Sequence, residues 1–138
     1  MRPEDIEYII IHCAATKPSM DIGAPEIDQW HRQRGWRGIG YHYVIRRDGT
    51  RESGRPETRA GAHAQGYNTK SLGICMVGGI DEDGNPENNF TEDQWGALFQ
   101  LIYELLDRYP TAKIIGHNEV SNKACPSFDV QTWVVSHL

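Results

Sequence analysis

Two apolar segments of the sequence each end in a histidine: "YIIIH" ends at His12 and "KIIGH" ends at His117. Cys125 follows eight residues after His117 and stands directly before Pro126. Imidazole nitrogen and thiolate sulfur bind Zn²⁺ in tetrahedral geometry, and a catalytic zinc site keeps three protein ligands and a water. These residue types predict a catalytic site with one zinc ion, if the fold brings them together.

The spacing also allows a structural interpretation. A single histidine at the end of a strand is more often a hydrogen-bonded structural residue than a ligand, and six histidines in one chain offer accidental pairs. The stretch "GHNEVSNKACPSFD", which carries His117, Lys123 and Cys125, is therefore either a structural corner or half of a metal site.

The two histidines can meet only if their segments are neighbouring parallel strands. Residues 8–12 are short and apolar, as is typical of a central strand covered on both faces, and residues 71–78 ("SLGICMVG") and 113–117 are expected to form two further buried strands. The carboxyl ends of parallel strands share one edge of the sheet, where open α/β sheets bind ligands. Parallel pairing would thus place His12 beside His117.

Helix and turn signals alternate with these strands. Residues 24–35 predict a helix with Pro25 in its first turn, and residues 91–109 predict one with a capping box at Thr91 and Gln94. A short closing helix is expected over residues 128–138, and residues 41–55 predict a hairpin with a type I′ turn at Asp48-Gly49. The order indicates a single α/β domain over residues 1–138, with a mixed sheet flanked by helices.

Composition excludes several classes of protein. The net charge is −5 and the arginines are scattered, so the basic stripe of a nucleic-acid binder is absent. No apolar run approaches the ~18 residues of a membrane span, and the N-terminus carries no signal-peptide pattern. Cys13 and Cys75 stand in apolar runs typical of buried free thiols.

Several long motifs occur in one order: "IIIHCAATKPS", "GWRGIGYHYVIRRDGT", "GAHAQGYNTKSLGICMVGGID", "NFTEDQW" and "GHNEVSNKACPSFD". Together they resemble the lysozymes of T-odd coliphages, which are zinc-dependent N-acetylmuramoyl-L-alanine amidases within the type 2 amidase and peptidoglycan-recognition protein family. The resemblance runs from about Ile9 to Trp133. It implies that family's fold and hydrolysis of the lactyl-amide bond in peptidoglycan by a phage or prophage endolysin.

The resemblance also implies roles for individual residues. His12, His117 and Cys125 match the zinc ligands, and Tyr41 and Lys123 match residues needed for amide hydrolysis. Lys123 would stabilise the oxyanion, whereas for Tyr41 hydrogen bonding to that oxygen and proton transfer both remain open. Glu119 is equally an exposed loop acid or a residue that supports the ligands.

Weaker matches concern the substrate groove. His63 and Asn68 match groove positions in the family, and Trp36 is the tryptophan that we expect to be exposed rather than in the core. Tyr41 and His42 are adjacent on a strand, so we expect His42 to face away from the zinc. His31 and His137 are expected to be solvated.

The partners follow from the same resemblance. Peptidoglycan is the expected substrate of a monomeric enzyme made in the bacterial cytoplasm, which reaches the periplasmic wall after the membrane is permeabilised. A non-catalytic peptidoglycan-binding module is the alternative, which the presence of Cys125 and Lys123 disfavours. The coliphage relative also inhibits its phage's RNA polymerase, a further candidate partner, although the eleven residues before His12 are a shorter lead than that relative has.

Overall fold

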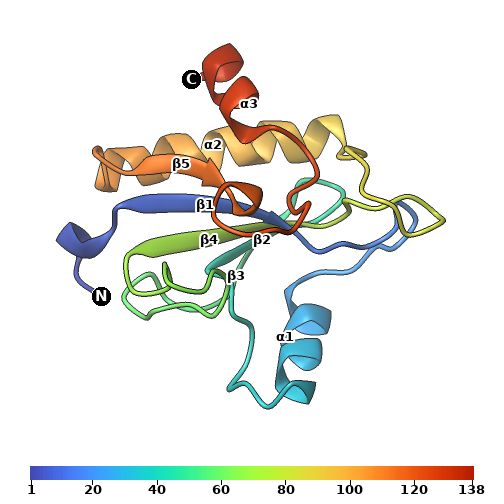
Figure 1. The fold of residues 1–138 in the computed structure, drawn as a ribbon, viewed down its shortest axis with the longest axis horizontal. Helices are drawn as coiled ribbons and strands as arrows, with labels where there is room; N and C mark the ends of the chain where they lie inside the picture. Colours follow the sequence, from blue (N-terminus) through green and yellow to red (C-terminus); the bar gives the residue numbers. More distant parts are fainter.

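A five-stranded mixed sheet lies at the centre of the computed structural model, which describes residues 1–138 (Figure 1). Its strands are β1 (Tyr8–Cys13), β2 (Tyr43–Ile45), β3 (Arg51–Ser53), β4 (Ser71–Met76) and β5 (Lys113–Gly116), in the order β3-β2-β4-β1-β5. β1 pairs in parallel with both β4 and β5. The predicted parallel pairing of the strands that lead to His12 and His117 is therefore confirmed.

Helices cover both faces of this sheet. α2 (Glu92–Arg108) and α3 (Val130–His137) lie on one side in Figure 1, and α1 (Ala24–Gln33) lies on the other. The larger core cluster joins Ile9 and Ile11 of β1 to the apolar side of α2, and the smaller one joins Ile27 of α1 to the opposite face of the sheet. Burial on both faces explains why the central strands are apolar throughout. No helix is both long and apolar enough to cross a membrane.

α1 and α2 begin where the sequence predicts, and α3 begins at Val130, two residues after its expected start. The Thr91 hydroxyl accepts the N–H of Gln94 at 3.1 Å, and the Gln94 side chain accepts the N–H of Thr91 at 3.0 Å, so the capping box is present. Pro25 stands in the first turn of α1. Asp129 caps α3 by accepting the N–H of Gln131 at 3.1 Å.

The hairpin β2–β3 forms as predicted, but the expected type I′ turn is wrong. Gly49 has a φ of 88° and donates its N–H to the carbonyl of Arg46 at 2.8 Å, whereas Asp48 is not among the residues with positive φ. A type I′ turn needs positive φ at both central residues, so this is a type I turn followed by a left-handed glycine. The Asp48 carboxylate accepts the N–H of Thr50 at 2.9 Å, a local bond that favours this conformation.

Glu57 anchors the long segment between β3 and β4, which also carries His63. Its carboxylate accepts hydrogen bonds from the hydroxyls of Tyr43 and of Tyr109, the latter at 2.6 Å, and from Arg108 Nη2 at 2.7 Å. Burial acts to raise the pKa of Glu57, but these hydrogen bonds outweigh it and hold the pKa below the ordinary value of 4.5. The segment is thus tied to β2 and to the end of α2.

Replacing Glu57 with glutamine is expected to lower the free energy of unfolding at pH 7 by about 1–3 kcal/mol, because hydrogen bonds to a charged group are lost. A carboxyl with a depressed pKa stabilises the fold above its unfolded pKa, and this contribution is lost as the pH falls through the folded pKa. The difference between wild type and Glu57→Gln should therefore shrink below about pH 4. Urea unfolding at several pH values measures it.

Glu82→Gln provides the control, because Glu82 is exposed in a loop. It should change the free energy of unfolding by less than about 0.5 kcal/mol at each pH. A Glu57→Gln deficit that stays constant down to pH 3 would show that the charge of Glu57 is not what stabilises the fold.

Candidate metal centre

β1 and β5 bring the two histidines together at the carboxyl edge of the sheet. Ile11 is opposite Gly116 in the parallel register, so the next residue of each chain segment is His12 or His117. β5 ends at Gly116, and His117 begins the short 3-10 turn η2 (His117–Glu119). The two imidazole rings lie with their centroids 4.5 Å apart.

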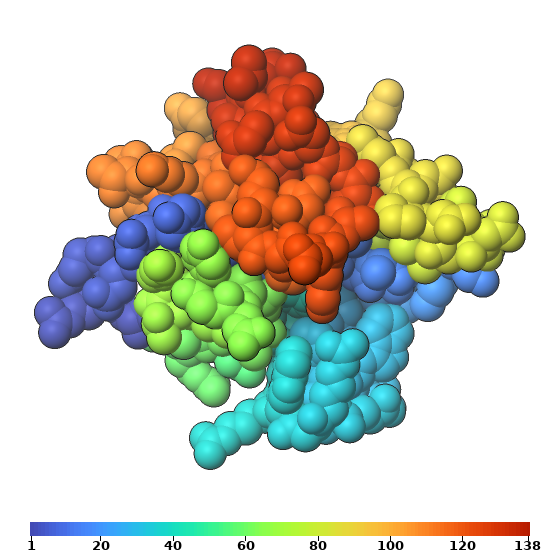
Figure 2. All heavy atoms as spheres, viewed as in Figure 1, coloured from blue at the N-terminus to red at the C-terminus, as the bar shows by residue number.

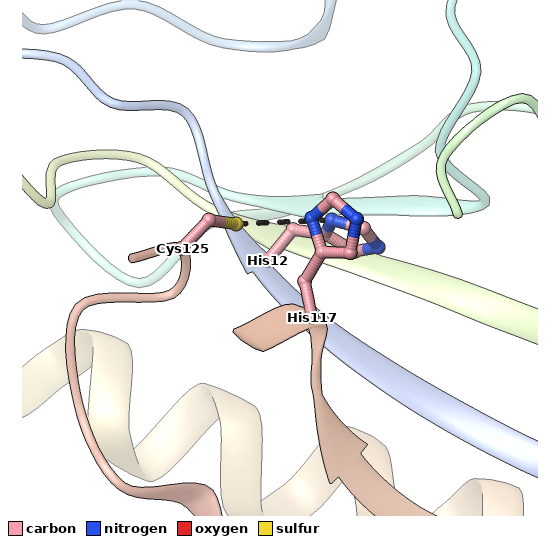
Figure 3. Close-up of side chains that lie close together, drawn as sticks. All are labelled: His12, His117 and Cys125. Atoms are coloured by element: carbon pink, nitrogen blue, oxygen red, sulfur yellow. Dashed lines mark hydrogen bonds between the residues drawn. The ribbon is translucent and has the colours of Figure 1, made fainter. Parts of the chain in front are cut away.

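Cys125 approaches the pair from the loop that follows η2 (Figure 3). Its Sγ lies 3.8 Å from Nδ1 of His12 and accepts the backbone N–H of Cys13 at 3.1 Å. One ligand atom from each of His12, His117 and Cys125 lies within 4.8 Å of the others. Bond lengths of about 2.0 Å to nitrogen and 2.3 Å to sulfur in a tetrahedral site imply a nitrogen-to-sulfur separation of about 3.5 Å. The three residues therefore fit a zinc ion.

The protonation states suit a metal site. Burial, followed by the nearby charges of His63, His117 and Lys123, lowers the pKa of His12 well below its ordinary value. Burial and then Lys123 lower the pKa of His117. Both imidazoles are thus neutral at pH 7, which is the form that binds zinc. A hydrogen bond between the side chains of Cys13 and Cys125, followed by burial, raises the pKa of the Cys125 thiol, so a cation is needed to favour its thiolate.

The three residues lie in a groove with a volume of about 720 Å³. The predicted catalytic and substrate-contacting residues also line it, namely Tyr41, Lys123, His63, Asn68 and Trp36. In Figure 2 the orange loop after β5, the green segment before β4 and the cyan segment after α1 gather on the face in view. The structure therefore brings all the predicted site residues into one groove.

Tyr41 and Lys123 both line this groove but differ in their exposure to solvent. The ring of Tyr41 lies 5.1 Å from the ring of His12, and burial is the main cause that raises the pKa of Tyr41 well above 10. Tyr41 is therefore a neutral phenol that can donate a hydrogen bond. Lys123 is exposed. The hydroxyl of Ser121 accepts the backbone N–H of Lys123 at 3.2 Å and donates to the His117 carbonyl at 3.0 Å, which links the backbone of Lys123 to η2.

His63 and Asn68 make bonds within the protein rather than facing the groove freely. His63 is 9% exposed, and its ring nitrogens lie 2.8 Å from His12 Nε2 and 3.2 Å from Ser71 Oγ. The Asn68 side-chain oxygen accepts the backbone N–H groups of His63 and Ala64 at 2.9 and 3.0 Å. A direct hydrogen bond from His63 to substrate stays a prediction that this geometry disfavours.

The first helix contributes one histidine that the sequence interpretation missed. His31 was expected to be solvated, but it is 7% exposed and its Nδ1 accepts the N–H of Gly40 at 2.9 Å. Trp36 is 37% exposed and its ring lies 4.6 Å from the His31 ring. His31 therefore supports the wall of the groove on which Trp36 stands.

The open question on Glu119 has a structural answer. Its carboxylate accepts the N–H of Gly116 at 2.6 Å and a side-chain N–H of Gln131 at 3.1 Å. Glu119 thus fixes the start of η2 and ties it to α3.

His42 is buried away from the three ligands, where its Nδ1 accepts the N–H of Gly73 and its Nε2 donates to the Arg59 carbonyl. The prediction that His42 faces away from the three candidate ligands is confirmed, although Tyr41 and His42 precede β2 rather than lying on a strand.

Comparison with known proteins agrees with this geometry. Residues 2–128 match the family model described as N-acetylmuramoyl-L-alanine amidase. The endolysin of Escherichia phage T7 is 50% identical over 94% of this chain and 86% of its own length. The amidase LysC from Clostridium intestinale is 34% identical with a TM-score of 0.79, over 91% of this chain and 78% of its own.

An animal protein shares the same fold. Bumblebee PGRP-SA superimposes with a TM-score of 0.81 at 28% identity, over 97% of this chain and 83% of its own. The resemblance inferred from the motifs is therefore confirmed on both sides, the phage enzymes and the peptidoglycan-recognition proteins. The chain belongs to the N-acetylmuramoyl-L-alanine amidase family, as an amidase of the phage endolysin type.

Proposed function

We propose that this single domain is a zinc-dependent endolysin that hydrolyses the amide between the lactyl group of N-acetylmuramic acid and the L-alanine of the peptidoglycan stem peptide. The observation that supports this most is the convergence of His12, His117 and Cys125 within 4.8 Å in a groove that Lys123 also lines. The family match supports the choice of bond, and the donor set supports zinc.

A zinc ion held by these three residues would act as a Lewis acid that lowers the pKa of a bound water to about 7 and polarises the scissile carbonyl. Attack on that carbonyl gives a tetrahedral oxyanion on the substrate. Lys123 would stabilise this charge, and its position among the residues that line the groove with the three ligands supports this role. Tyr41, as a neutral phenol beside His12, would donate a hydrogen bond to the same oxygen.

The groove itself would hold the substrate. Trp36 exposes an aromatic face at its edge, and the guanidinium of Arg34 lies 5.6 Å from the centre of that ring. Aromatic faces pack against sugar and peptide groups with a large apolar contact area. The enzyme would act from the periplasmic side of the wall after the membrane is permeabilised. Inhibition of a phage RNA polymerase and the monomeric state stay predictions of the resemblance.

Incubation of the purified protein with peptidoglycan, with and without a chelator, tests the proposed reaction. We expect release of stem peptides with new L-alanine amino groups, intact glycan strands, and loss of this activity when the chelator removes the metal. Activity should return when zinc is added back. New reducing sugar ends without free L-alanine amines would instead identify a glycosidase and reject the proposal.

A further inference from the structure

His63 takes part in a series of hydrogen bonds that leads to Nε2 of His12, the ring nitrogen that does not face Cys125. The Ser71 hydroxyl lies 2.7 Å from the carbonyl oxygen of Tyr67 and 3.2 Å from His63 Nε2. His63 Nδ1 in turn lies 2.8 Å from His12 Nε2, and the two rings meet edge to face at 85°. The remaining nitrogen of His12, Nδ1, is the one that faces Cys125.

The donor and acceptor properties of these groups determine which atom donates in each of these hydrogen bonds. A carbonyl oxygen only accepts, so the one hydroxyl proton of Ser71 must be donated to Tyr67. Ser71 Oγ then accepts from His63, which places the proton of the neutral His63 ring on Nε2. His63 Nδ1 is left as an acceptor and takes the N–H of His12 Nε2. The lone pair of His12 is thereby left on Nδ1, directed toward the metal centre.

The backbone around His63 is shaped to hold its ring in this place. A Cβ at Gly73 in β4 would lie 2.6 Å from His63 Cγ, and a Cβ at Gly61 would lie 2.5 Å from His63 Cδ2. A glycine inside a buried strand weakens the strand, and such a position often marks a close approach of another group. Asn68 fixes the backbone of the same segment. Ring position and ring orientation are thus both determined.

We propose that His63 is a positioning residue that holds His12 in its Nε2-protonated tautomer and presents Nδ1 to zinc. This inference rests on the proposed zinc-dependent function. This series of hydrogen bonds ends on a backbone carbonyl, so it cannot transfer a proton further. The role of His63 is therefore to orient His12. Outer-shell partners of zinc-bound histidines typically change metal affinity by about 10–100-fold when they are removed.

Two substitutions at His63 separate orientation from packing. His63→Phe keeps an aromatic ring over Gly73 but removes both nitrogens, and it should weaken zinc binding by about 10–100-fold in chelator competition. His63→Asn places an amide oxygen near the position of Nδ1, so it should retain most of the affinity of the wild type. If the ring acts only as packing, His63→Asn would be the weaker binder of the two, and the proposal would be overturned.

His42→Phe is the matched control, because His42 is also buried and doubly hydrogen-bonded but contacts none of the three ligands. It should lower the melting temperature of the metal-free protein while leaving zinc affinity near that of the wild type. An equal loss of affinity in His42→Phe and His63→Phe would indicate general loosening of the segment and would overturn the positioning role.

Long-range ¹H–¹⁵N NMR of the imidazole rings in the metal-free protein gives a readout that needs no zinc. We expect His12 and His63 each to be protonated on Nε2. Protonation of His12 on Nδ1 would contradict the inference directly. The two proposals can be told apart by their failures. A wild-type protein that binds no zinc would contradict both the proposed function and the positioning role. Equal zinc affinity of the wild type and His63→Phe would contradict the positioning role alone.

Discussion

Cys125→Ser is expected to lose tight zinc binding and, with it, amide hydrolysis. Serine has nearly the shape of cysteine and can still accept the N–H of Cys13, so the loop should keep its course. A hydroxyl remains protonated at neutral pH, however, whereas zinc requires a deprotonated ligand such as a thiolate. The loss of affinity should exceed the roughly 10–100-fold effect of an outer-shell substitution, because a direct ligand is removed.

Metal analysis of the purified variant and chelator competition measure this effect. Cys125→Asp should recover part of the zinc affinity, since carboxylate oxygen is also a zinc ligand. Cys75→Ala is the control: this buried thiol is outside the ligand group, so its loss should lower stability without changing the zinc content. A Cys125→Ser protein with full zinc content and full activity would show that the ligand assignment is wrong.

Local sequence patterns determine most of the framework of this site. The apolar strands predicted at residues 8–12 and 113–117 and the capped helix that follows Thr91 all form, because a few adjacent residues are enough to indicate a strand or a helix cap. The expected burial of residues 113–117 is wrong, since β5 is an edge strand of the sheet and only Gly116 in it is buried. The meeting of His12 and His117 follows from one further assumption, that their strands are parallel neighbours, and the register of β1 and β5 satisfies it.

The parts that sequence reasoning missed depend on contacts between distant residues. His31 looks solvated among the charged residues of α1, yet it is buried against the rings of Trp36 and Tyr41. Gly40, nine residues later, supplies an N–H to the buried ring nitrogen. The turn at Asp48-Gly49 is compatible with two geometries, and hydrogen bonds to Arg46 and Thr50 select one of them. Such partners cannot be identified from the spacing of residues alone.

His63 is the instructive intermediate case. Its motif predicts a place along the substrate groove, and the residue does line the groove, but its ring is hydrogen-bonded to His12. The sequence holds one signal for this arrangement, namely Gly73 in the middle of the buried segment "SLGICM". A glycine there indicates that something approaches the strand closely, but only the structure identifies the ring of His63 as that group.

Lys123→Met should lower kcat for amide hydrolysis by about 100 to 1000-fold, the usual effect of removing one group that stabilises an oxyanion. Methionine keeps much of the length and flexibility of the lysine side chain but has no charge. Lys123 is exposed and its backbone N–H bonds to Ser121, so neither burial nor the loop's hydrogen bonding depends on the ammonium group. Zinc affinity should therefore change far less than kcat.

Steady-state kinetics on a soluble muropeptide, with zinc content measured on the same sample, separates the two effects. Lys113→Met is the matched control, because Lys113 is equally exposed but begins β5 at the end of the strand opposite His117. It should leave kcat unchanged. If Lys123→Met instead raises KM with kcat intact, Lys123 binds the ground state and the transition state equally, and the charge on the oxyanion is stabilised by other groups.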